Sequence, residues 1–307
     1  MSHHKPQRFS VGICASDLAP QLPSLIRFLR ASEYGEDFSL EKVVVVASGC
    51  PLKLIASAKE AAAGDSRIAL IVEDERNGKA EAINRILQET KGEFLVMLNA
   101  DTFPSPNAIG EILQMITDPR VGAVSAMPVF EDSGGLLRHS LSLMWGAHSQ
   151  LSLKLNHAGL SNHACDELIV VRKSLVTSLP VNVVNDGAYI GGLVRARGYQ
   201  VRFSTAAKVK IAVPTLLIDL VRQRRRIIYG HVQVWKKIGR PPRTLESMMF
   251  IDPMTSLKTL VRVLSQKPRL ILAMPVVAAG ESISVLMGLV DAMRSTDMHI
   301  VWRRNVE

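Results

Sequence analysis

Asp101 is the residue whose position in this chain most clearly favours ligand chemistry. It closely follows residues 94–98, a continuous apolar run that is long enough for a strand buried on both faces and short for a helix. Pro104 and Pro106 prevent a helix from starting directly after it. We therefore expect the Asp101 carboxylate at the carboxyl end of a central strand, the edge where open α/β sheets bind their ligands.

Three further polar segments carry side chains suited to anions or to proton transfer. Gly78 lets the backbone approach a phosphate closely, and Lys79 offers a mobile positive charge. Asp186 follows Asn185 at the start of a predicted helix, where either side chain can also act simply as the helix cap. Residues 222–226 are strongly basic, which suits an anionic ligand or the headgroups of a lipid surface.

The elements that must position these residues alternate between strand and helix. Strands are predicted where apolar runs end in polar or turn-forming residues, and helices where apolar residues recur at helical spacing. This alternation is typical of an α/β fold with a doubly wound, mostly parallel sheet. The predicted strands are 9–15, 42–47, 68–72, 94–98, 121–127, 168–171 and an edge strand at 199–204, and the predicted helices are 20–30, 52–63, 80–88, 108–116, 136–155 and 185–198.

The C-terminal part of the chain is expected to form a helical appendage. Pro241 and Pro242 mark a break, which divides the chain into residues 1–240 and 241–307. One helix is predicted over 246–267, and residues 270–290 are apolar apart from Glu281. The latter segment is as long as a bilayer span, but its Pro, Gly, Glu and Ser residues equally suit short helices in the membrane interface. A helix packed on the main domain or on another subunit is the third possibility.

Composition narrows the class of protein. The 307 residues can hold a large α/β core, and the net charge of +9 favours an anionic partner such as a nucleotide, a phospholipid surface or a nucleic acid. Cys14, Cys50 and Cys165 show no metal or redox spacing, which indicates buried thiols in a reducing compartment. We expect no signal peptide at the N-terminus.

The order of the motifs resembles that of inverting family 2 glycosyltransferases with a GT-A fold, in the branch whose members face a membrane. The similarity extends from about residue 9 to about residue 239. Residues 9–17 resemble the family's opening strand, 42–50 its second strand, and 76–84 its Arg-x-Gly-Lys segment. The resemblance implies a site for a UDP- or GDP-type nucleotide sugar whose residues include Ala15, Asp17, Ser48, Arg76 and Lys79.

Two motifs depart from the usual sequence of this family. Ala47-Ser48-Gly49-Cys50 stands where Asp-Asp-Gly-Ser is usual, so the carboxylate that contacts the base is missing at that position. Asn99-Ala100-Asp101 resembles the Asp-x-Asp motif with its first Asp replaced. By this resemblance Asn99 contacts the ribose and Asp101 binds Mg²⁺ or Mn²⁺, because such an ion needs a hard oxygen ligand that leaves room for diphosphate oxygens.

The resemblance also implies roles for residues nearer the acceptor. Asn185-Asp186 resembles the family's Glu-Asp pair, which makes Asp186 the base that deprotonates the acceptor hydroxyl on the face opposite the departing diphosphate. Gln223 and Arg226 belong to a segment similar to Gln-x-x-Arg-Trp, with Ile227 in place of Trp, and Arg226 would neutralise the leaving group. The residues expected on the acceptor side are Asn185, Trp145 and Glu167.

The expected function is metal-dependent, inverting transfer of a sugar from a nucleotide donor to a lipid-linked or glycan acceptor. The expected location is the cytoplasmic face of a membrane, with an anionic lipid surface and no nucleic acid as partner. A non-catalytic scaffold of the same fold is the main alternative, because two motif carboxylates are replaced. A nucleotidyltransferase and a dinucleotide-dependent oxidoreductase are disfavoured, since no glycine-rich phosphate loop follows a predicted strand. A zinc site at His157, His163, Cys165 and Asp166 is disfavoured because their spacing matches no usual zinc motif.

Overall fold

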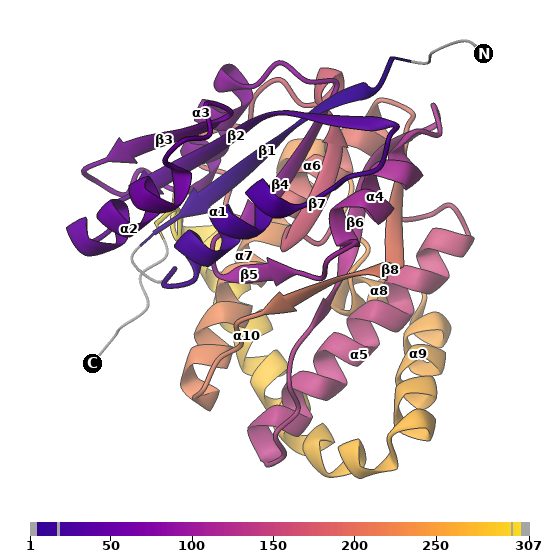
Figure 1. Ribbon diagram of the computed structural model, residues 1–307. Coiled ribbons are helices and arrows are strands. Elements are labelled where there is room, and N and C mark those ends of the chain that lie inside the picture. Colours follow the sequence, from indigo (N-terminus) through magenta and orange to yellow (C-terminus); the bar gives the residue numbers. More distant parts are fainter. Residues whose placement is uncertain (1–4, 17–18, 296, 302–307) are drawn as a thin grey trace.

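The computed structural model describes residues 5–16, 19–295 and 297–301, so Asp17, expected at the donor site, lies outside the described residues. The strands are β1 (Gln7–Ala15), β2 (Phe38–Ser48), β3 (Ile68–Glu73), β4 (Phe94–Asn99), β5 (Thr102–Pro104), β6 (Val121–Val129), β7 (Leu168–Arg172) and β8 (Gln200–Ile211). In the described part of the chain they form one eight-stranded sheet in the order β3-β2-β1-β4-β7-β6-β8-β5, with helices on both faces (Figure 1).

Two apolar clusters fill the two faces of the sheet. Strand β2 shows how one run of apolar residues serves both clusters, because Val43 and Val45 point to one face while Val44 and Val46 point to the other. The first face is covered by α1 (Leu22–Ala31), α2 (Leu52–Ala62) and α4 (Ala108–Ile116), and the second by α3 (Lys79–Glu89) and α6 (Asp186–Ala196). Burial on both faces explains why the strands are continuously apolar rather than alternating.

The N-terminal half of the sheet is parallel as predicted, whereas β7 runs against both of its neighbours. Strands β3, β2, β1 and β4 are parallel, and β7 is antiparallel to β4 and to β6. The chain therefore enters β7 beside the carboxyl end of β4, with Leu168 paired to Leu98. This reversal brings the residues that precede β7 to the ligand-binding edge.

Strand β8 corrects the prediction of an edge strand at 199–204. It lies between β6, to which it is parallel, and β5, to which it is antiparallel. A register shift between Ala126 and Met127 in the β6 pairing lets β8 continue to Ile211, well beyond the predicted end. The short strand β5 then occupies the edge.

The remaining helices form a layer at one end of the sheet. They are α5 (Leu136–His157), α7 (Leu217–Ile238), α8 (Leu245–Ile251), α9 (Pro253–Gln266), the 3-10 helix η2 (Pro268–Ala273) and α10 (Met274–Arg294). The short 3-10 helix η1 (Lys173–Leu175) instead follows β7 at the opposite end of the sheet, where Lys173 N donates to Glu93 O. The single helix predicted over 246–267 is wrong. It is two helices, because Asp252 caps α9 through Thr255 N and Pro253 occupies the first turn.

Helices α8 to α10 pack back on α5 and α7 (Figure 1). Leu143 of α5 belongs to one buried apolar cluster with Val263 and Leu270. Gly288 of α10 lies so close to α7 that a Cβ atom there would be 2.9 Å from Arg225 O. Two sets of ion pairs join α7 to α10, Arg224 with Glu281 at 2.6 Å and Arg225 with Asp291 at 2.6 Å.

The segment Pro268–Arg294 is long and apolar enough to cross a membrane by length and composition. Its most apolar window has a mean hydropathy of 2.0, and only 17% of that window is buried. The face away from α7 exposes large apolar side chains, including Leu286 at 67% and Met293 at 77%. In the part of the chain that the structure describes, this helix therefore presents an exposed apolar surface.

Candidate active site

One cavity of about 790 Å³ brings together the polar strand ends and the C-terminal helices. It begins at the carboxyl ends of β1, β2 and β4 and continues between α5, α7, α8 and α10. Every described residue predicted for the site lines it. These are Ala15, Ser48, Arg76, Lys79, Asn99, Asp101, Trp145, Glu167, Asn185, Asp186, Gln223 and Arg226.

Asp186 stands in the first turn of α6 and is only 5% exposed. Asn185, not Asp186, caps the helix, because Asn185 Oδ1 accepts a hydrogen bond of 3.0 Å from Ala188 N. The next residue, Gly187, packs directly on the chain before β7, where a Cβ atom would lie 2.3 Å from Ala164 O. This close packing holds the Asp186 carboxylate beside Asp166.

Lys79 connects these two carboxylates. Its ammonium group pairs with Asp166 and lies 3.0 Å from Asp186 Oδ2. Burial alone would lower the pKa of Lys79, but the two carboxylates outweigh it and raise that pKa. Burial raises the pKa of Asp186 to about 6, with Lys79 opposing and the Asp166 charge adding to the shift, whereas Lys79 outweighs burial at Asp166 and lowers the pKa of that group to about 2. Asp186 is therefore the carboxyl group of the trio whose pKa is raised toward the neutral range.

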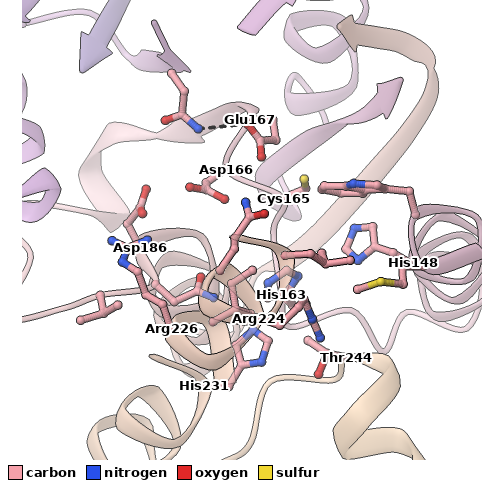
Figure 2. A pocket seen from close by; sticks show the side chains of 18 of the residues that line it. His148, His163, Cys165, Asp166, Glu167, Asp186, Arg224, Arg226, His231 and Thr244 are labelled. Carbon is pink, nitrogen blue, oxygen red and sulfur yellow. Dashed lines mark hydrogen bonds between the residues drawn. The ribbon is translucent and has the colours of Figure 1, made fainter. Parts of the chain in front are cut away.

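Glu167, predicted on the acceptor side, lies beside Asn99 at the end of β4. Asn99 Nδ2 donates to Glu167 Oε2 at 3.1 Å, and the dashed line at Glu167 in Figure 2 marks this hydrogen bond. Thr102 Oγ1 donates to the backbone oxygens of both residues. Burial raises the pKa of Glu167 to about 8, with further contributions from the charges of Asp166 and Asp101. Two carboxylates, Asp101 and Glu167, thus face one corner of the cavity.

The end of β2 carries a hydroxyl in place of the family's carboxylate. Ser48 Oγ donates to Glu73 Oε2 at 2.7 Å, and these residues are paired across β2 and β3. Gly49 lies against Arg76, where a Cβ atom would be 2.7 Å from Arg76 Cγ. Burial raises the pKa of the nearby Cys14 thiol to about 12, which disfavours the thiolate at neutral pH.

Arg226 reaches the cavity from α7 and lies near Asp186 and Asp166 (Figure 2). Its Nε donates to His299 O at 3.3 Å. The following residue, Ile300, packs against Gly78, where a Cβ atom would meet Ile300 Cγ2 at 2.9 Å. The C-terminal segment 297–301 therefore covers part of the wall formed by residues 76–79.

Three histidines separate the carboxylates from the apolar end of the cavity (Figure 2). The ring centroids of His148 and His163 are 5.9 Å apart, and those of His163 and His231 are 5.5 Å apart. Burial lowers the pKa of His148 to about 3 and that of His163 to about 4, so both rings are neutral. Among the residues that the structure describes, no hydrogen-bond partner reaches the buried Nε2 of His148 or of His231. This row of imidazoles was not apparent from three residues so far apart in the sequence.

The zinc site considered from the sequence does not form in the described part of the chain. His157 is exposed at the end of α5 and does not line the cavity, while His163 packs among the other histidines. In residues 5–16, 19–295 and 297–301, no three His, Cys, Asp or Glu side chains are arranged to hold a metal ion by themselves.

Known structures share this fold. A mannosyltransferase, PcManGT from Pyrobaculum calidifontis in complex with GDP-Man and Mn²⁺, matches with a TM-score of 0.65 at 20% identity, covering 94% of this chain and 88% of that one. Glucosyl-3-phosphoglycerate synthase from Mycobacterium tuberculosis in complex with phosphoglyceric acid matches with a TM-score of 0.53 at 16% identity, covering 77% of this chain and 82% of that one. The fold is therefore GT-A, as expected.

Sequence comparison points to the same group of enzymes. Poly-beta-1,6-N-acetyl-D-glucosamine synthase of Staphylococcus aureus is 22% identical over 165 residues, which are 52% of this chain and 40% of the synthase. The chain thus matches less than half the length of that relative. The family model for glycosyl transferase family 2 matches residues 10–177, more than half of the chain. The protein belongs to glycosyl transferase family 2.

Proposed function

We propose that this protein is an inverting, metal-dependent glycosyltransferase that works at a membrane surface. A nucleoside diphosphate sugar would bind at the polar end of the cavity, and the lipid part of a lipid-linked acceptor would occupy the apolar end. The observation that carries the proposal is the position of Asp186, a buried carboxylate that shares one cavity with Asp101, Lys79 and Arg226.

The polar end has the side chains that a diphosphate requires. Asp101 provides a carboxylate, and one or two carboxylates are the usual protein contribution to a Mg²⁺ or Mn²⁺ ion that also binds phosphate oxygens and water. The residues present therefore fit such an ion, and the Mn²⁺ complex of PcManGT supports the choice. When bound, the ion would neutralise charge on the departing diphosphate. Arg226 would add a second positive charge there.

Asp186 is suited to act as the general base. An inverting displacement needs a base opposite the leaving group, and a base is most effective when its pKa lies near the working pH. Burial brings the pKa of Asp186 to about 6. Lys79 holds the carboxylate in place, and Asp166 holds Lys79, so the trio positions the base before the acceptor arrives.

The apolar end is suited to a hydrocarbon chain. It is lined by side chains from α5, α8 and α10, including Leu143, Trp145, Phe250 and Val277. Phe250 is 88% exposed, so the cavity reaches an apolar outer surface of the C-terminal helices. An acceptor with a lipid part can therefore extend from that surface toward Asp186.

The same surface is suited to lie in a membrane interface. The exposed apolar side chains of α9 and α10 are accompanied by exposed basic residues, among them Lys258, Arg262, Lys267 and Arg269. Spanning the bilayer would separate Glu281 and Asp291 from their arginine partners on α7 and leave two carboxylates in hydrocarbon. We therefore favour an interfacial helix at the cytoplasmic face over a single span.

The test is a panel of UDP-, GDP- and dTDP-sugars scored for release of nucleoside diphosphate, with membrane lipid extract as acceptor and with Mn²⁺ or EDTA. Transfer that requires both Mn²⁺ and the lipid extract is the expected result. Nucleotide binding without transfer to any acceptor would instead favour the scaffold alternative.

A further inference from the structure

The carboxylate that is missing from the Asp-x-Asp motif has a neighbouring carboxylate, Glu167, on the chain that enters the adjacent strand β7. Asn99 stands where the motif's first carboxylate is usual, and Glu167 lies beside it on the chain entering β7. The two residues are 68 positions apart in the sequence and meet only because β7 runs antiparallel to β4.

Asn99 and Glu167 lie so close together that a carboxylate at either position would place its negative charge in the same part of the cavity. Asn99 Nδ2 donates to Glu167 Oε2 at 3.1 Å, and both side chains line the cavity together with Asp101. If residue 99 were an aspartate, its carboxylate would face that of Glu167 at hydrogen-bonding distance, and the two charges would repel. The amide instead orients Glu167 while leaving it the only carboxylate of the pair.

We propose that Glu167 supplies the second carboxylate of the donor site, taking the place of the aspartate that Asn99 replaces. It would bind the divalent ion beside Asp101, directly or through a water molecule. This inference rests on the proposed function, because it assigns a residue to the metal and diphosphate corner of that site.

Ser48 stands at the other position where the family's usual carboxylate is replaced, and its neighbouring glutamate does not face the cavity. Ser48 also donates to a glutamate on the next strand, Glu73, but Glu73 does not line the cavity. Glu73 is positioned to orient the Ser48 hydroxyl rather than to contact a ligand. The two sites look similar along the sheet, yet only Glu167 faces the donor.

The experiment measures Mn²⁺ binding directly, from the loss of the free-ion electron paramagnetic resonance signal, with GDP and separately with UDP. Glu167→Gln should bind Mn²⁺ at least about tenfold more weakly than wild type. The double variant Asn99→Asp/Glu167→Gln, which returns a carboxylate to the motif position, should recover to within about threefold of wild type. Such recovery would distinguish a metal ligand from a structural residue. If Glu167 had only a structural role, a carboxylate at position 99 would not restore Mn²⁺ affinity.

Glu93→Gln is the matched control, since Glu93 pairs with Arg172 at the opposite end of β4 and β7 and does not line the cavity. It should bind Mn²⁺ like wild type, and melting curves should show all variants folded. Glu167→Gln that is folded and binds Mn²⁺ as tightly as wild type would overturn the inference. So would a double variant no better than Glu167→Gln.

Two further results distinguish a failure of the proposed function from a failure of the role proposed for Glu167. Wild-type transfer that is equally fast in EDTA would exclude the metal and this role of Glu167, while sugar transfer would stand. Wild type that binds neither GDP nor UDP would overturn the donor site itself, and this inference with it.

Discussion

The two ends of the cavity are built in opposite ways. At the polar end, Asp101, Lys79 and Asp186 stand at strand ends and helix starts, and hydrogen bonds and ion pairs hold their neighbours. At the apolar end the walls are helices joined by a few apolar contacts and by the ion pairs of Arg224 and Arg225. The polar end is thus positioned by the sheet, whereas the apolar end depends on the packing of α8 to α10.

Because the two ends are built independently, single substitutions should be able to change sugar transfer and membrane binding separately. Changes at the polar end should affect turnover without affecting lipid binding, and changes on the outer face of α10 should do the reverse. Four predictions test the comparison, in order of decreasing expected effect.

Asp186→Asn should reduce sugar transfer by about 100-fold or more, because the amide cannot take the acceptor proton. Binding to lipid vesicles should stay the same. Single-turnover release of nucleoside diphosphate measures the first effect, and vesicle flotation the second. Asp219→Asn, an aspartate in the first turn of α7 that does not line the cavity, is the control and should keep wild-type transfer. Wild-type transfer by Asp186→Asn would place the base elsewhere.

Arg224→Gln should lower the free energy of unfolding by about 3 kcal/mol, because it leaves Glu246 and Glu281 together without their cation. Thermal unfolding measures this change. Arg222→Gln is the control on the same helix, since Arg222 makes only a surface pair with Asp219 and should shift stability by less than about 0.5 kcal/mol. Equal stability of the two variants would show that the Arg224 cluster does not join the helices.

Leu286→Glu combined with Met293→Glu should weaken binding to phosphatidylserine vesicles by about tenfold, since the two apolar side chains, inserted only in part into the interface, together contribute about 1.4 kcal/mol. Binding of GDP or UDP should not change. Leu52→Glu, on exposed α2, is the matched control and should leave vesicle binding unaltered. If Leu52→Glu weakened vesicle binding as much as the α10 variant, the membrane surface would not be the one formed by α9 and α10.

Asp166→Asn should move the acid limb of the activity profile to lower pH. The base must be deprotonated, so activity should fall as the pH drops through about 6, where burial places the pKa of Asp186. Removing the Asp166 charge lowers that pKa, and we expect a shift of about one pH unit. The measurement is kcat/KM against pH, with wild type as reference. A shift to higher pH would show that Asp166 acts mainly through Lys79.

Much of the polar end was predictable because it depends on local sequence. A buried strand ends at Asn99, a helix begins at Asp186, and Gly78 precedes Lys79, so each side chain was expected near the same edge of the sheet. The structure places all of them in one cavity. Periodicity and strand-end residues carry this information without any knowledge of distant contacts.

The apolar end was less predictable. The break between α8 and α9 is visible in Asp252-Pro253, a capping residue followed by proline, yet apolar spacing alone indicated one continuous helix. The row of His148, His163 and His231 comes from three elements that meet only in the fold. Such contacts depend on how helices pack, and packing has no short-range signature in the sequence.

The sequence by itself determined that this chain forms an α/β sheet with a carboxylate at the end of a central strand, because hydrophobic period and strand-end chemistry are local properties. Only the tertiary structure decided which strand lies beside β4 and in which direction it runs. That direction places Glu167 next to Asn99, and the packing of α6 on the chain before β7 brings Asp166 and Asp186 together around Lys79. Strand order and direction follow from the balance of contacts over the whole chain, so no single segment contains them.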